Sequence, residues 1–191
     1  MDGFRGLRKG RVGARFTASQ AGIIRGLVIQ VAELVGGDPE HLPTPPAPGS
    51  AGPADPLEGL SGLLGAGPDH PPEDPVLARL LPDAYADDAA AAGEFRRFTE
   101  QDLRSGKLAA ARTVLDTLPA EGGRVELSGE EAQVWLRALN DVRLALGVRL
   151  SITEDYDQRV TDLDPADPRA AYLWVYDWLT YLQETLVRAL W

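Results

Sequence analysis

The sequence predicts a mainly α-helical protein: a compact helical domain with a small two-stranded sheet and a long disordered insertion rich in proline and glycine. Three observations predict this class. Two amphipathic stretches each follow a residue pair with capping-box spacing, a proline- and glycine-rich segment lies between them, and the C-terminal stretch is largely apolar. With 191 residues, 44% apolar and 25% charged, the chain is long enough for one domain with its own core.

The N-terminal end combines a short extended region with a helix. Residues 4–16 contain two short runs around Lys9-Gly10, which favours a small hairpin. Thr17 followed by Gln20 has capping-box spacing, and it predicts a helix from about Ala18 to Leu34 with one broad apolar face. Gly36-Gly37 should end that helix.

Residues 36–74 form the predicted insertion. Ten of these 39 residues are proline and eight are glycine, so the segment buries too little apolar surface to offset the entropy lost on ordering. Within it, Leu57–Leu64 is a small apolar island that either docks on a partner or is incidental to function.

Two helices should follow the insertion. The spacing of Val76, Leu77, Leu80 and Leu81 predicts a short helix ended by Pro82. Residues 89–118 are rich in Ala, Glu, Arg and Leu and predict a long helix, interrupted or kinked near Ser105-Gly106.

A second capped helix follows a short extended run. Residues 124–127 form a candidate strand, and Ser128 with Glu131 predicts a helix reaching about Leu146. This run and helix repeat the local pattern of residues 16–24, which favours a small two-stranded sheet joining the two ends of the domain.

The final helix should begin at Asp167-Pro168 and reach nearly to Trp191. Apolar and aromatic residues surround most of its circumference, so we expect it to be buried on several sides. It would be either the central element of the fold or partly an interface, and a homo-oligomer would form through it.

We therefore divide the chain into a basic strand and helix segment (1–35), the insertion (36–74) and the helical body of the same domain (75–191).

The composition excludes several kinds of chemistry. The chain has no cysteine and no methionine except Met1, which excludes disulfides, thiolate sites and an internal methionine switch. Both histidines, His41 and His70, lie in the insertion, and no phosphate-binding glycine loop is present. We predict no catalytic, cofactor-binding or metal-binding residues and no enzymatic activity.

Two further expectations concern calcium and location. The acidic residues between 154 and 167 lack the glycine and the terminal glutamate that a calcium loop needs, which favours a solvated acidic loop. The chain has no apolar stretch of about 20 residues and starts without an apolar signal core, so we expect a cytoplasmic protein with no membrane partner.

Charge is distributed unevenly along the chain. The formal net charge is −10, yet residues 1–25 contain six cationic residues and a single acid, Asp2. This basic patch is either solvated and paired with acids of its own domain, or it contacts DNA or an acidic partner. The residues predicted to make such a contact are Arg5, Arg8, Lys9, Arg11 and Arg15.

A helix-turn-helix or winged-helix interpretation would use residues 107–118 and 128–146. The candidate recognition helix starts Ser-Gly-Glu-Glu, which would place two acids against phosphates. The basic N-terminal segment is therefore the better candidate for any DNA contact, and no clear DNA-binding motif is present.

Four groups of residues carry a family resemblance. They are Arg79-Leu-Leu-Pro-Asp-Ala-Tyr85; Glu94-Phe-Arg-Arg97 with Thr99-Glu100 and Leu103-Arg104; residues Trp135 to Gly147; and Tyr181 to Val187. Together with the basic N-terminal segment they resemble an actinobacterial family, long labelled a domain of unknown function, of oxidative-stress transcriptional regulators of the AosR type. The polar members, Arg96, Arg97, Asn140, Asp141 and Arg143, either cap helices and form partly buried pairs or share a partner surface.

The resemblance implies a non-enzymatic regulator of the oxidative-stress response that acts through a stress sigma factor or RNA polymerase. Redox sensing attributed to cysteines in this family has no counterpart here, which leaves a partner-dependent role. The alternative is a cytoplasmic interaction adaptor unrelated to transcription that uses the aromatic C-terminal helix.

Overall fold

The computed structural model describes residues 3–38, 41–42, 67–153 and 169–191. Most of these residues are helical, and a small antiparallel sheet completes the fold, so the predicted class is confirmed. The elements in chain order are β1 (Arg5–Gly6), the 3-10 turn η1 (Arg8–Gly10), β2 (Val12–Phe16), α1 (Ala18–Leu34), α3 (Pro75–Leu80), α4 (Ala89–Thr117), β3 (Gly123–Leu127), α5 (Gly129–Arg149) and α7 (Arg169–Leu190).

The sheet has three strands in the order β1-β2-β3, where the sequence predicted two. The predicted hairpin is the β1–β2 pair, and the predicted pairing of the two capped runs is the β2–β3 pair, with Phe16 opposite Gly123. Because β2 belongs to both pairs, the two pairs form one sheet of three strands. Lys9 and Gly10 close the hairpin with φ angles of 62° and 68°, a left-handed pair that suits a tight turn.

Both predicted capping boxes are present. The Thr17 Oγ1 accepts from the Gln20 backbone N–H at 3.2 Å, and the Gln20 side chain accepts from the Thr17 N–H at 2.9 Å. Ser128 and Glu131 make the same reciprocal pair at 3.1 and 2.7 Å. Each box begins its helix directly after a strand. Because β2 and β3 are antiparallel, α1 and α5 leave the sheet at opposite ends of this strand pair.

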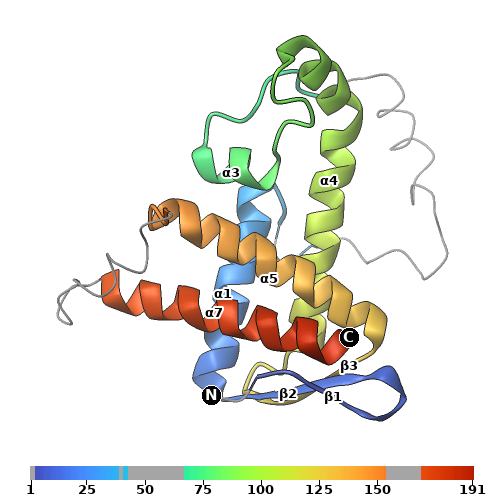
Figure 1. Ribbon diagram of the computed structural model, residues 1–191, viewed down its shortest axis with the longest axis vertical. Coiled ribbons are helices and arrows are strands. Elements are labelled where there is room, and N and C mark those ends of the chain that lie inside the picture. The colour runs from blue at the N-terminus through green and yellow to red at the C-terminus, as the bar shows by residue number, and fades with distance from the viewer. Residues whose placement is uncertain (1–2, 39–40, 43–66, 154–168) are drawn as a thin grey trace.

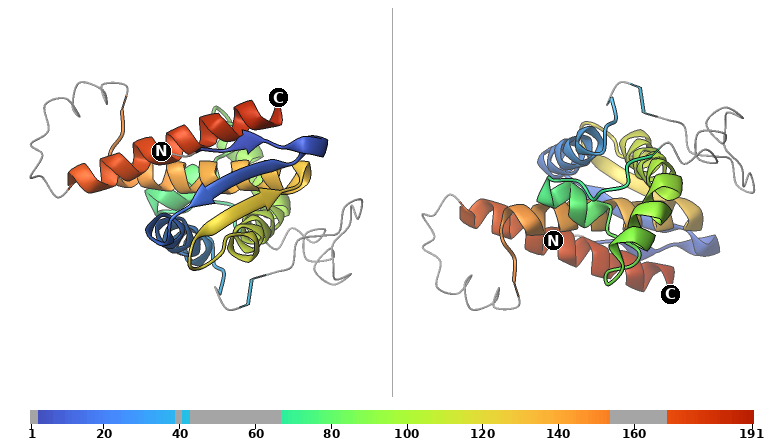
Figure 2. Two further views of the ribbon diagram at one scale, coloured as in Figure 1. Left: turned by 90° about the horizontal axis from the view of Figure 1, so that it is seen from below. Right: turned by 90° about the horizontal axis from the view of Figure 1, so that it is seen from above.

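The helices cover one face of the sheet and leave its other face open (Figures 1 and 2). α7 lies beside α5, which lies in turn against α1 and α4. α5 is therefore the central helix, and α7 forms an outer layer next to β1.

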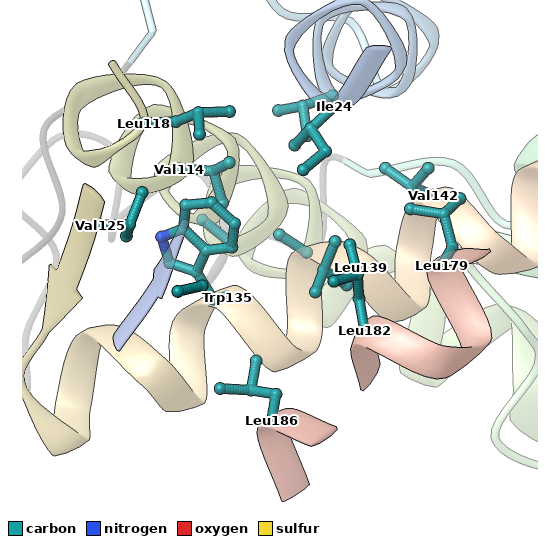
Figure 3. Packing of buried hydrophobic residues seen from close by; sticks show 14 of the residues in the cluster. Ile24, Val114, Leu118, Val125, Trp135, Leu139, Val142, Leu179, Leu182 and Leu186 are labelled. Carbon is teal, nitrogen blue, oxygen red and sulfur yellow. The ribbon is translucent and has the colours of Figure 1, made fainter. Parts of the chain in front are cut away.

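The core lies where the sheet meets these helices (Figure 3). Trp135 of α5 is fully buried, and its ring centroid lies 5.7 Å from that of Phe4 and 6.2 Å from that of Phe16. The Trp135 Nε1–H donates to Thr117 Oγ1 at 2.8 Å, so the indole is buried without an unpaired donor. These contacts join the sheet to both α4 and α5.

Two predictions about helices were wrong. α4 continues without interruption through Ser105 and Gly106, because one glycine costs a helix only about 1 kcal/mol and packing against α1 and α5 outweighs that cost. α7 is buried on one side only, through Trp178, Leu179, Leu182 and Leu186. It also exposes large side chains, namely Tyr172, Trp174, Tyr181, Val187 and Trp191.

Two further predictions are confirmed, and three others concern residues that the structure does not describe. The short helix with Pro75 at its start is confirmed, as is the end of α7 next to Trp191. Leu57–Leu64 and the acidic residues 154–167 lie outside the described residues, as does the predicted start of the last helix at Asp167. No helix in the described ranges combines the length and apolarity needed to cross a membrane.

Candidate partner-binding face

The open face of the sheet is lined with arginine. In β2, Val12, Ala14 and Phe16 are buried while Arg15 is exposed, and in β3 Val125 and Leu127 are buried while Arg124 is exposed. Because alternate residues of a strand point to opposite faces, the apolar set faces the helices and the charged set faces outward. Two strands far apart in sequence thus contribute cations to one surface.

The strand register brings these cations together. Arg15 lies directly opposite Arg124, and Arg5 lies opposite Gly13, a position on the same face as Arg15. We call the set Arg5, Arg11, Arg15 and Arg124, with Glu126 among them, the cationic sheet face.

The cationic sheet face has four guanidinium groups and one carboxylate, which pairs with two of them. Glu126 contacts Arg11 at 3.1 Å through one oxygen and Arg124 at 2.7 Å through the other. Arg5 and Arg15 have no ion-pair partner among the described residues. The face therefore keeps an excess of positive charge on an otherwise acidic chain, and its planar guanidinium groups suit bidentate contact with carboxylate or phosphate.

The structure places the five predicted contact residues at one end of the molecule. Arg5, Arg11 and Arg15 belong to the cationic sheet face, and Arg8 and Lys9 are exposed in the hairpin turn that joins β1 to β2. Arg11 pairs with Glu126, an acid of its own domain, as the first alternative for the patch predicted. Contact of the patch with DNA or an acidic partner stays a prediction.

The sequence reasoning missed Arg124, because it considered only cations close to the N-terminus. The alternation of Arg124-Val-Glu-Leu127 was the available signal, combined with the predicted pairing of that run to residues near Phe16. By contrast, Arg25, which is one of the six N-terminal cations, forms hydrogen bonds within the fold. Its Nη1 donates to the carbonyls of Leu115 at 2.9 Å and Leu118 at 3.1 Å, at the end of α4.

A second arginine group lies buried near the other end of α4. Arg96 is 5% exposed and Glu100 is 3% exposed, and their side chains form an ion pair. Arg96 also donates to the Leu81 carbonyl at 2.9 Å and pairs with Asp83 at 2.7 Å. Arg104 binds Glu100 at 2.8 Å and donates to the Val35 carbonyl at 2.9 Å.

This buried network ties the ends of α1 and α3 to α4. It is made by residues of the segments that carry the family resemblance, and its burial confirms the structural interpretation of Arg96.

Asn140, Asp141 and Arg143 form partly buried pairs inside the fold, as the structural alternative for these residues predicted. The Gln183 amide of α7 donates to Asn140 Oδ1 at 3.3 Å, and Arg143 donates to Gln183 Oε1 at 2.6 Å. The Lys107 Nζ donates to Asp141 Oδ1 at 2.7 Å. Burial raises the pKa of the Asp141 carboxyl above its usual 3.8, and the attraction of Lys107 offsets this only in part.

The helix-turn-helix interpretation is wrong. Residues 107–118 are mostly the second half of the continuous helix α4, and α5, the candidate recognition helix, is the central helix of the core. Among the described residues no group of three or more acids or histidines is placed to hold a metal ion.

The fold and this face together define a helical protein with a positively charged, solvent-exposed sheet surface. The chain belongs to the family described as "Domain of unknown function (DUF2017)", whose model matches residues 1–190.

Curated relatives carry a functional name. The chain is 42% identical over 139 residues to the putative oxidative stress regulator AosR of Mycobacterium leprae, covering 65% of this chain and 62% of the relative. It is 42% identical over 132 residues to the oxidative stress regulators AosR of Mycobacterium bovis and Mycobacterium tuberculosis, covering 62% of this chain and 59% of each relative. The match thus spans about 60% of the length of these relatives. No solved structure matches the chain significantly.

Proposed function

We propose that this protein is a non-enzymatic regulator of the oxidative-stress response that acts by binding a protein of the transcription machinery, such as a stress sigma factor or RNA polymerase. The observation that carries the proposal is the cationic sheet face, on a chain whose curated relatives are named oxidative stress regulators. An acidic surface of the partner would meet Arg5, Arg15 and Arg124.

The same face would meet promoter DNA if the regulator also contacts it. Arginine contacts to phosphates do not read sequence, so contacts of this kind would strengthen binding and add little specificity. Since the chain has no cysteine, we propose that the oxidative signal reaches it through the partner.

The test begins with affinity capture of the tagged protein from its native cells, with and without peroxide. The triple variant Arg5→Gln, Arg15→Gln, Arg124→Gln should lose the partner that the unaltered protein captures. The matched control, Arg79→Gln, Arg112→Gln, Arg188→Gln, removes the same charge from α3, α4 and α7 and should retain it. Equal recovery by both variants would contradict the assignment of the face.

Salt dependence separates the two kinds of partner. If phosphates are bound, the slope of log affinity against log salt should fall by about one for each arginine removed from the face, and the control variant should keep the original slope. If the partner is a protein, the affinity should depend less on salt concentration, and the dependence should appear mainly in the association rate.

The second candidate, an interaction adaptor, is favoured by the exposed aromatic side of α7. Trp174 is 46% exposed although it stacks on the buried Trp178, and Trp191 is 88% exposed. If this side mediates self-assembly, light scattering should show a mass that rises with concentration, and Trp174→Ala should abolish the rise. A mass independent of concentration in both proteins would contradict assembly through α7.

A further inference from the structure

A cavity of about 590 Å³ lies between the C-terminal halves of α1 and α5 and the start of α7. Both α1 and α5 begin directly after a sheet strand, so their C-terminal halves lie away from the cationic sheet face. The cavity is therefore a separate site, built from other residues.

Apolar side chains line most of the cavity. Leu27, Val31 and Leu34 contribute from α1, and Val142 and Leu146 contribute from α5. The three α1 residues are only partly buried, so they keep apolar surface turned toward the cavity. Its volume falls within the roughly 300–1,000 Å³ of small-molecule sites, and a void of this size lined by aliphatic groups lacks the packing contacts of a closed core.

Two arginines are the charged residues in the described part of the cavity lining. Apart from the phenol of Tyr172, the ionisable residues among the described lining are Arg149 and Arg169. Arg149 is exposed, so its guanidinium stands where the cavity meets solvent. Its Nη1 donates to Gln30 Oε1 at 3.3 Å, a long bond that fixes the side chain beside α1 and leaves its other donors available.

We propose that this cavity binds an amphipathic anion, a small molecule with an aliphatic or aromatic body and a carboxylate head. The body fills the space between Leu27, Val31 and Leu146, and the carboxylate accepts hydrogen bonds from Arg149. A cationic amphipath of the same shape would meet the like charge of Arg149, which disfavours its binding. Through this site the chain, which has no cysteine, would respond to a small molecule by binding it rather than by oxidation of a thiol.

The test measures binding of decanoate to the full chain by calorimetry, at concentrations below those at which it forms micelles, with decyltrimethylammonium as the matched cation. Decanoate should bind at one saturable site and the cation should not. Arg149→Gln should weaken decanoate binding by about tenfold, the loss expected for one charge-assisted pair at a partly exposed site. Arg188→Gln, on the exposed side of α7, should leave the affinity unchanged.

Leu27→Trp provides a second variant that fills the cavity. Because Leu27 is only partly buried, the larger ring can extend into the empty space, and the melting temperature should not fall. This variant should bind no decanoate. Absence of saturable binding to the unaltered chain, equal binding of the cation, or equal affinities for Arg149→Gln and Arg188→Gln would overturn the proposal.

Discussion

The two arginine groups of this protein differ in their surroundings more than in their composition. On the cationic sheet face Arg5 and Arg15 are exposed and have no ion-pair partner among the described residues, and Glu126 is shared by two others. In the buried network Arg96 and Arg104 donate to carboxylates and backbone carbonyls of their own chain. Buried cations need internal partners because burial is costly, whereas exposed cations stay hydrated and free to meet another molecule. The comparison indicates which arginines maintain the fold and which are available for binding.

The strongest test of this comparison removes the central carboxylate of the buried network. Glu100→Gln leaves two arginines beside a neutral side chain and should lower the free energy of unfolding by about 3 kcal/mol. Asp116→Asn is a matched control, because Asp116 pairs with Arg112 at the same spacing in the same helix but at its surface. It should cost less than about 0.5 kcal/mol in urea denaturation. Equal losses would mean that burial does not distinguish the two groups.

A second prediction concerns the pH dependence of stability at Asp141. Because burial raises the pKa of this carboxyl above 3.8, the folded state holds its proton to higher pH than the unfolded state does. The native chain should therefore lose stability as pH rises from 3.8 to the raised pKa. Asp141→Asn has no carboxyl to ionise at this position and does not lose this stability. Its free energy of unfolding relative to that of the native chain should therefore increase across this pH range and stay constant above it. Urea denaturation of both proteins at several pH values would show this, and the opposite slope would mean that Lys107 controls the pKa.

The smallest effect is expected on the sheet face itself. Arg15 and Arg124 lie opposite each other on adjacent strands, where like charges repel. The double variant Arg15→Gln, Arg124→Gln should change the free energy of unfolding by no more than about 0.5 kcal/mol, and in the stabilising direction. A loss above 1 kcal/mol, as in the buried group, would remove the distinction on which the binding proposal depends.

Much of the local structure could be predicted from the sequence. The capping boxes at Thr17 and Ser128 fixed where α1 and α5 begin, because the side chain and the backbone donors it satisfies lie within three residues. The strand alternation at residues 124–127 was predictable for the same local reason, whereas its pairing with the N-terminal run was inferred from the repeated strand-and-helix pattern. The continuity of α4 through Gly106 was not, because packing against other helices decided it.

The candidate site was only partly predictable. Arg5, Arg11 and Arg15 were found because they cluster in sequence, whereas Arg124 joined them only through the β2–β3 register. Nothing local distinguished Arg25 from these residues, yet it caps α4 from inside the fold.

By itself the sequence determined the helical class, the helix starts, the excess of cations near the N-terminus and the absence of sulfur chemistry, because each depends on residue type or short-range spacing. Only the tertiary structure decided which helix is central, which arginines are buried, and which apolar residues surround a cavity between α1, α5 and α7. Burial and long-range contact are properties of the packed chain. Residues of the same type therefore differ in role according to what surrounds them, and local sequence does not specify those surroundings.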